Sequence, residues 1–163
     1  MTRPMTREIK VTPLTAQNFA PYGDVLDADG APDKIINAGQ CGRFHDRAQV
    51  DVMEARVGIS IFKATLRSLP YTLDLIERHP EGSQAFVPMS DDPFLVIVSD
   101  GPNAVPQAFL TNGAQAINFH RGTWHGVLTP LAGNGQFAVI DRIGETPNLQ
   151  EHRYETPWVI VAD

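Results

Sequence analysis

Short runs of apolar residues recur along the chain, and glycine, proline, asparagine or aspartate separates most of them. Many runs alternate between apolar and polar residues, which is typical of strands with one buried face. We expect strands at residues 9–14, 22–26, 34–37, 57–66, 71–79, 84–87, 94–99, 107–111, 115–120, 126–129, 137–142 and 154–161. The last run could instead be a tail, with Pro157 marking an edge. Residues 42–49 are too irregular to assign.

Helical patterns are rare in this sequence. Thr15 can cap one turn over residues 15–20, which Pro21 would end. Elsewhere few windows of about 11 residues lack both glycine and proline, because the 163 residues include 13 of each. The pattern therefore predicts an all-β sandwich or barrel with one or two short helices. No linker or run of charge divides the chain, so we expect a single domain over residues 1–163.

Charge and composition exclude several classes of function. The 13 basic and 19 acidic residues give a net charge of −6, and the absence of a basic cluster argues against nucleic-acid binding. The one cysteine, Cys41, excludes an internal disulfide and indicates a reducing compartment. Residues 1–10 are not followed by the apolar segment of a secretory signal, and no run approaches the roughly 20 apolar residues of a membrane span. We therefore expect a cytoplasmic protein without membrane attachment.

Two segments of the chain share one arrangement of polar residues. In each segment two polar residues lie two positions apart, and a third follows five positions after the second. The six residues are Glu77, His79 and Gln84 in the first segment, and Asn118, His120 and His125 in the second. Residues two apart in a strand share a face, and a four-residue loop would turn each segment into a hairpin.

These hairpins would bring polar side chains together. We expect His79 opposite Gln84 and His120 opposite His125, with Cβ atoms about 4.5–5.5 Å apart. The groups would converge inside the barrel if the two hairpins face each other. Solvated surface hairpins are the alternative, and apolar neighbours argue against it. These neighbours are Phe86, Val87, Phe119, Trp124 and Val127. Polar groups buried among them must pair with each other, a ligand or a metal.

The same residues resemble the two motifs of the cupin superfamily. The first cupin motif carries His-x-His and, about five residues on, a Glu, and here these positions hold Glu77, His79 and Gln84. The second motif, Pro-x-Gly-x-x-His, resembles HRGTWH, in which His120 replaces the proline and His125 is the final residue. Two imidazoles of the usual ligand set, those of His79 and His125, are therefore present.

Among cupins, the sequence is similar to the ureidoglycolate lyase family. The similar segments are PYGDV (21–25), GRFHDRA (42–48), ERHPEGSQAFVPM (77–89), FLTNG (109–113), INFHRGTWH (117–125) and IDR (140–142). The resemblance implies a double-stranded β-helix, the cupin jelly-roll barrel, that is commonly a homodimer. It also implies a lyase of allantoin and purine degradation that cleaves ureidoglycolate, a small anion, to glyoxylate and urea. A non-catalytic anion-binding cupin and a metal-dependent cupin oxygenase or isomerase are the alternatives.

The implied reaction makes three chemical demands. The hydroxyl of ureidoglycolate must lose a proton, the departing urea nitrogen must gain one, and cationic donors must hold the carboxylate. We expect His120 to be the acid–base residue, and a histidine that only bonds to a loop is the alternative. Glu77 is equally a candidate base, or a partner that orients His79. His125 completes the set of expected catalytic residues.

A divalent metal is the implied cofactor. If an ion binds, we expect His79, Gln84 and His125 to contact it, with Glu77 supplying the only carboxylate. Gln84 stands where cupins usually have Glu, and the loss of one charged ligand lowers the affinity for a hard cation. Imidazole, carboxylate and amide ligands suit nickel, zinc, iron or manganese. The family resemblance points to nickel.

Other segments supply candidate substrate-binding residues. Lys63 ends an apolar strand, where a charge would lie at the barrel mouth, and Arg43 and His45 lie in a segment that could form a lid. Either Arg43 or Lys63 could bind the carboxylate. Asn118 could bond the ureido carbonyl or close a turn. Trp124 could form a wall of the pocket or pack the turn.

Three further charged residues are expected to be structural. Alternation points Arg78 away from Glu77 and His79, which favours a salt bridge or a dimer contact. Asp141 and Arg142 are adjacent and are expected to form a structural ion pair.

Overall fold

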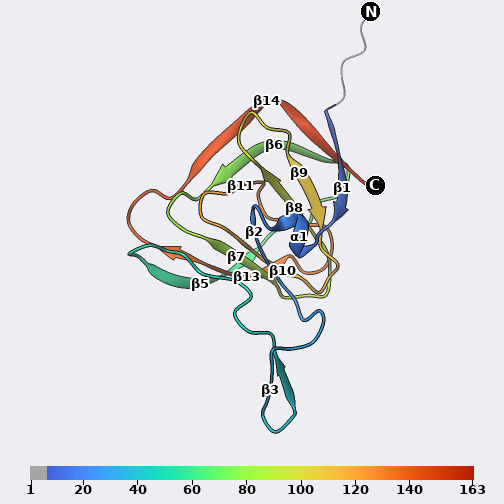
Figure 1. Cartoon of the computed structure of the whole chain (residues 1–163). Coiled ribbons are helices and arrows are strands. Elements are labelled where there is room, and N and C mark those ends of the chain that lie inside the picture. Colours follow the sequence, from blue (N-terminus) through green and yellow to red (C-terminus); the bar gives the residue numbers. More distant parts are fainter. Residues whose placement is uncertain (1–6) are drawn as a thin grey trace, which may run out of the picture.

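The computed structural model describes residues 7–163, and strands make up most of this chain (Figure 1). The elements are β1 (Glu8–Pro13), α1 (Ala16–Phe19), β2 (Gly23–Leu26), β3 (Lys34–Ile36), β4 (Cys41–Arg43), β5 (Arg56–Lys63), β6 (Tyr71–Arg78), β7 (Gln84–Pro88), β8 (Phe94–Ser99), β9 (Gln107–Leu110), β10 (Ala116–Phe119), β11 (Trp124–His125), β12 (Thr129–Pro130), β13 (Gln136–Ile143) and β14 (Gln150–Val161). Residues 1–6, which belong to the segment in which no secretory signal was expected, lie outside the described part.

Two sheets form the barrel and a third, smaller sheet projects from it. The seven-stranded sheet has the order β11-β6-β14-β1-β9-β8-β12, and the five-stranded sheet has the order β2-β10-β7-β13-β5. The remaining sheet is the β3–β4 hairpin. The expected all-β, cupin-type jelly-roll fold is confirmed.

Strand β8 shows why the apolar runs become buried strands. All six of its residues are buried, because alternate side chains enter two different apolar clusters. Phe94, Val96 and Val98 belong to the first cluster, which also receives side chains from the five-stranded sheet. Leu95 and Ile97 belong to the second, formed with residues of β1, β6 and β14. Each such side chain contributes about 1.5–3 kcal/mol when it is fully buried.

Local signals determine the short helix α1. The hydroxyl of Thr15 accepts a hydrogen bond from the backbone N–H of Asn18, and the side chain of Asn18 accepts one from the N–H of Thr15. This reciprocal capping box starts the helix, and Pro21 follows its end. The predicted helical turn is therefore confirmed. Among residues 7–163 the structure contains no helix that is both long and apolar enough to span a membrane.

The final strand is an inner strand of its sheet. Strand β14 lies between β6 and β1, so the expected last strand is confirmed and the alternative, a tail with Pro157 marking an edge, is wrong. The register of β14 against β6 shifts between Arg153 and Trp158, and Pro157 lies within this irregularity. A bulge of this kind accommodates a residue that cannot donate to the ladder.

The two polar segments do not form hairpins, so the predicted pairs His79–Gln84 and His120–His125 are wrong. Strands β6 and β11 belong to the seven-stranded sheet, whereas β7 and β10 belong to the five-stranded sheet. Each segment therefore crosses from one sheet to the other. Backbone bonds join the crossings to other segments, as where Gly122 N–H donates to the carbonyl of His79 at 2.9 Å. A four-residue loop predicts a hairpin only if both strands share a sheet.

The true pairs join the two segments to each other. His125 lies opposite Glu77 in the seven-stranded sheet, and Phe119 lies opposite Gln84 in the five-stranded sheet. The crossings therefore bring Glu77, His79 and Gln84 close to His125, although by a different route from the one the spacing suggested.

Candidate active site

A cavity of about 750 Å³ opens between the two sheets. This volume lies within the range of small-molecule sites. Apolar walls come from Phe62, Phe86, Val127, Leu128 and Leu149. The ionisable and amide side chains on its surface are Lys63, Arg67, Glu77, His79, Gln84, His125 and Asn148.

Three of these side chains form a tight cluster. Glu77, His79 and His125 each offer one potential metal-ligand atom, and these atoms lie within 4.8 Å of one another. The strand pairing explains the contact, because Glu77, near the end of β6, lies directly opposite His125 of β11. His79 follows two positions after Glu77 and so lies on the same side of the chain. The rings of His79 and His125 have centroids 5.2 Å apart.

Backbone carbonyls fix the orientation of both imidazoles. Nδ1 of His79 donates to the carbonyl of Asn148 at 2.8 Å, and Nδ1 of His125 donates to that of Gly126 at 2.8 Å. A carbonyl only accepts, so in the neutral rings the proton is on Nδ1 and the lone pair is on Nε2. Both Nε2 atoms are buried and have no hydrogen-bond partner among residues 7–163. Orientation of this kind by backbone oxygens is typical of metal-binding histidines.

Gln84 contributes a fourth polar atom from the opposite sheet. Its side-chain Nε2 donates to Oδ2 of Asp141 at 3.1 Å. The other end of the amide, Oε1, is buried and has no partner within the described residues. Gln84 lines the cavity, and its unpartnered Oε1 is an atom that can only accept hydrogen bonds.

Burial shifts the pKa of two members of the cluster, His125 and Glu77. Desolvation lowers the pKa of His125 to about 4, and the neighbouring His79 adds to this effect, while the bond to Gly126 opposes it. His125 is thus neutral at physiological pH, which is the form that binds a metal. Burial raises the pKa of Glu77, with a further contribution from Glu151, while His79 opposes the shift.

The donor set fits a divalent metal ion. Two imidazole nitrogens, one carboxylate and one amide oxygen are ligands that transition metals such as nickel or zinc accept. Three of these residues have a buried atom without a partner, and bound metal would satisfy those atoms. The group Glu77, His79 and His125 is therefore a candidate metal centre, and Gln84 lies in the same cavity.

Two cationic side chains lie in the same cavity. The structure places Lys63 there, at the end of β5, as the sequence analysis expected. Arg67, in the loop that follows β5, was not expected. Nothing distinguishes Arg67 from other surface charges in the sequence, and the same holds for Asn148, whose loop follows β13. Both residues reach the cavity through the path of a loop, which no strand pattern predicts.

Comparison with known proteins identifies the family of this chain. The family model for ureidoglycolate lyase matches residues 6–161. The chain belongs to the ureidoglycolate lyase family. A relative named ureidoglycolate lyase, from Rhodobacter capsulatus, is 51% identical over 93% of this chain and 97% of its own length. Proteins of the same name from Chelativorans sp. and Pseudomonas syringae pv. tomato are 46% and 41% identical, each over at least 94% of this chain and 96% of their own length.

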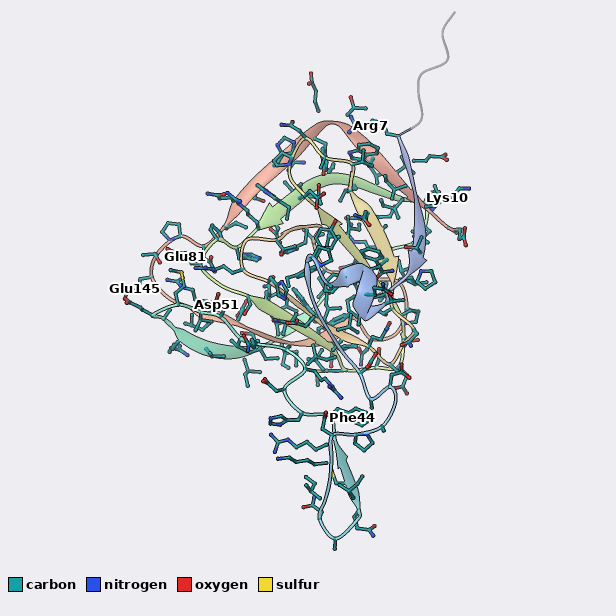
Figure 2. All side chains as sticks on the ribbon, viewed as in Figure 1. Arg7, Lys10, Phe44, Asp51, Glu81 and Glu145 are labelled. Atoms are coloured by element: carbon teal, nitrogen blue, oxygen red, sulfur yellow. The ribbon has the colours of Figure 1, made fainter. Side chains whose placement is uncertain are left out.

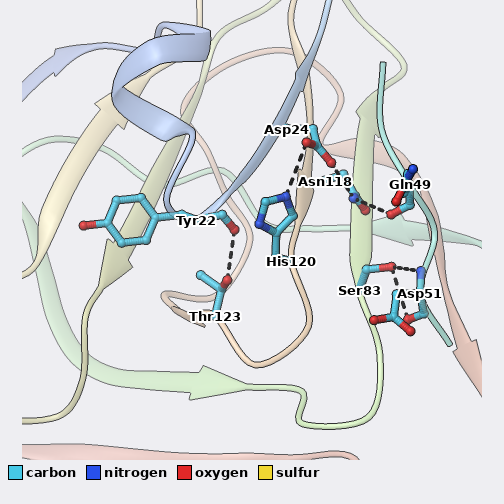
Figure 3. A network of polar contacts seen from close by, with 8 residues as sticks. All are labelled: Tyr22, Asp24, Gln49, Asp51, Ser83, Asn118, His120 and Thr123. Carbon is cyan, nitrogen blue, oxygen red and sulfur yellow. Dashed lines mark hydrogen bonds and ion pairs between the residues drawn. The ribbon is translucent and has the colours of Figure 1, made fainter. Parts of the chain in front are cut away.

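In this family member His120 and Asn118 lie outside the cavity. Phe119 points into the core, where its ring stacks on that of His125 with centroids 4.2 Å apart, so its two neighbours face outward. Asn118 is fully buried and donates to Asp24 and to the carbonyl of Gln49 (Figure 3). His120 contacts Asp24 at 3.3 Å, and 46% of its side chain is exposed. The expected convergence of His120 and Asn118 with the other polar groups is therefore wrong.

Three other expected site residues also lie away from this chain's cavity. Arg43 and His45 belong to the β3–β4 hairpin and the segment after it, which extend away from the barrel (Figures 1 and 2). Trp124 precedes His125 on β11 and points to the opposite face. Its ring packs against the second core cluster and lies under the guanidinium of Arg78, 4.9 Å from the ring centroid. The alternation of side chains along β6 correctly predicted that Arg78 points away from Glu77.

The expected Asp141–Arg142 ion pair does not form. Alternation along β13 sends the two side chains to opposite faces. Asp141 receives the hydrogen bond from Gln84. Arg142 pairs with Glu81 at 3.3 Å and also donates to the hydroxyl of Thr146, which in turn donates to Glu81. Arg142 thereby ties the loop that carries Asn148 to the turn after His79.

Proposed function

We propose that the protein is a ureidoglycolate lyase that cleaves ureidoglycolate to glyoxylate and urea, a step of allantoin and purine degradation. Family membership and the names of the relatives support this activity. The observation that carries the proposal is the cluster of Glu77, His79 and His125, in a cavity that also contains cationic side chains. A binding protein for small anions would need the cations but not this ligand-like cluster.

We propose that the cluster holds a divalent cation. Nε2 of His79, Nε2 of His125, a carboxylate oxygen of Glu77 and Oε1 of Gln84 would be the ligands, because the first, second and fourth atoms are buried without partners in the described structure. When bound, such an ion supplies Lewis-acid polarisation of substrate oxygen atoms. The family resemblance points to nickel.

The carboxylate of the substrate would bind to Lys63 and Arg67. Both side chains line the cavity with the cluster. An arginine can bind a carboxylate through two parallel hydrogen bonds, whereas a lysine adds a compact charge. Two cations therefore suffice to hold one end of a small anion, while its hydroxyl and ureido groups lie toward the cluster.

Glu77 is the proposed acid–base residue. The reaction needs one proton to leave the hydroxyl and one to reach the departing urea nitrogen. As Glu77 takes the hydroxyl proton, the electrons of the O–H bond form the carbonyl of glyoxylate and the C–N bond breaks. The same proton can then pass from Glu77 to urea, so a single carboxylate balances the step. One carboxylate oxygen is enough to bind an ion, and the second can carry the proton.

The direct test measures glyoxylate and urea release from each enantiomer of ureidoglycolate. We expect stoichiometric release above the spontaneous rate for at least one enantiomer. His125→Ala should lower the rate by about 100-fold or more, since it removes a side chain from the cluster. His120→Ala is the matched control, because His120 lies outside the cavity, and it should change the rate by less than about threefold. Release at only the spontaneous rate would exclude the lyase activity.

For the assembly we propose a homodimer in which a second copy covers the outer face of the five-stranded sheet. Strand β5 is an edge strand, and Val57, Ile59 and Ile61 project from it into solvent, Ile59 with 75% of its surface exposed. In Figure 1 the β3–β4 hairpin extends from the same side of the barrel. An isolated two-stranded hairpin is only marginally stable in water, so packing on another copy would stabilise it. We also propose a cytoplasmic location, in keeping with the single cysteine.

A further inference from the structure

Asp141 lies next to Gln84 and has no ion-pair partner in the described part of the chain. It sits on β13 directly opposite Gln84 on β7, in antiparallel register. Its carboxylate accepts a hydrogen bond from Nε2 of Gln84 at 3.1 Å. Within residues 7–163 no Lys, Arg or His forms an ion pair with Asp141, whereas the adjacent Arg142 pairs with Glu81.

This contact determines which end of the Gln84 amide faces the cluster. A carboxylate only accepts hydrogen bonds, so the amide must turn its NH₂ group toward Asp141. Oε1 then faces away from Asp141 and is left buried without a partner, as are Nε2 of His79 and Nε2 of His125. Without a fixed acceptor, the two ends of an amide can exchange by a simple rotation. The NH₂ group would then point toward a bound cation.

The negative charge of Asp141 also affects the ligand oxygen. A hydrogen bond from an amide N–H to a carboxylate is charge-assisted, and it draws electron density toward the carbonyl oxygen at the other end. Gln84 is 6% exposed, so solvent screens this interaction little. A glutamate at position 84 would place two carboxylates side by side, which explains why an amide suits this position.

We propose that Asp141 is a positioning residue that fixes Oε1 of Gln84 as a ligand oxygen for the divalent ion. This inference rests on the proposed metal site. Asp141, which was expected to form an ion pair with Arg142, thus acts on the metal site through Gln84.

The test is titration of the metal-free, full-length protein with Ni²⁺ by calorimetry. Gln84→Ala and Asp141→Ala should each weaken Ni²⁺ binding about tenfold, since residues that orient metal ligands change affinity by about 10–100-fold. The double variant should bind no more weakly than Gln84→Ala alone, because Asp141 acts through Gln84. Asp141→Asn retains an acceptor oxygen and should stay within about threefold of the wild type. Asp74→Ala, which removes a half-exposed aspartate of β6, is the matched control and should leave affinity unchanged.

A spectroscopic readout separates positioning from a general structural role. The d–d absorption of bound Co²⁺ depends on the number and type of its ligands. Gln84→Ala and Asp141→Ala should therefore produce the same change in the Co²⁺ spectrum. A wild-type spectrum for Asp141→Ala, unchanged Ni²⁺ affinity in that variant, or additive losses in the double variant would each overturn the proposal.

Ureidoglycolate cleavage on the same preparations distinguishes this proposal from the proposed function. A wild-type protein that cleaves the substrate while Asp141→Ala binds Ni²⁺ normally overturns the positioning role alone. A wild-type protein that binds Ni²⁺ through the Asp141–Gln84 pair but does not cleave the substrate overturns the lyase activity alone. A wild-type protein that binds neither Ni²⁺ nor Co²⁺ overturns the positioning role whatever its activity.

Discussion

Protonation of His125 should destabilise the metal-free protein in mildly acidic solution. The imidazole is 2% exposed, and burial lowers its pKa from 6.5 to about 4 in the folded chain. The unfolded chain therefore binds the proton first as the pH falls. Because the folded chain holds His125 neutral, this residue contributes to the free energy of unfolding. The contribution is fully present above about pH 6.5 and is lost progressively as the pH falls from 6.5 toward 4.

The magnitude follows from these two values. One pKa unit corresponds to about 1.4 kcal/mol, so the complete shift amounts to about 3 kcal/mol. Between pH 7.5 and pH 5 the loss should be about 2 kcal/mol, which is a large part of the 5–15 kcal/mol that stabilises a typical domain.

Urea denaturation of EDTA-treated protein across this pH range measures the effect. Other groups also titrate, and the raised pKa of Glu77 stabilises the folded state as the pH falls. The informative quantity is therefore the difference in the free energy of unfolding between the wild type and His125→Gln. This difference should shrink by about 2 kcal/mol from pH 7.5 to pH 5. His120→Gln, at a half-exposed position, is the control and should parallel the wild type. A difference between wild type and His125→Gln that does not change with pH would refute the reasoning.

Three further predictions concern other parts of the molecule. Arg67→Ala should raise KM for ureidoglycolate about tenfold in steady-state kinetics, because one carboxylate contact is lost. Arg43→Ala is the control and should leave KM within about twofold. A tenfold rise of KM in Arg43→Ala would instead place the β3–β4 hairpin over the active site of a partner subunit. Ile59→Glu should convert a dimer to a monomer by light scattering, whereas Val105→Glu, at a similarly exposed position, should not; a dimer that survives Ile59→Glu must use another face. Gly135→Ala should lower the free energy of unfolding by about 2–5 kcal/mol, because φ is +70° and a Cβ would lie 2.1 Å from the carbonyl oxygen of Ala64; an unchanged urea midpoint would contradict this.

The sequence predicts the strands well because burial follows their alternation. Phe94–Val98 is wholly apolar, its strand is buried on both faces, and Thr15 caps helix α1 as expected. The spacing of Glu77 and His79 also correctly indicates a shared face. These features depend only on neighbours along the chain.

The wrong predictions concern features that depend on which sheet a strand joins. The loops after His79 and His120 have hairpin length, but they link different sheets. The position of His120 could still have been predicted from alternation. Ile117 and Phe119 are the large apolar residues of β10 and must face the core, so the polar residues between and after them face outward. Arg67 and Asn148 had no comparable signal because loops carry them to the cavity.

The two crossings place the proposed ligands on different sheets, since Gln84 begins a strand of the five-stranded sheet and His125 lies in the seven-stranded one. A cation bound between them would act as a cross-link through the middle of the barrel. It would bind only when both sheets are folded and docked, and opening of either sheet would release it. Metal binding would then stabilise barrel closure by mass action, so chelation should increase amide hydrogen exchange in both sheets together.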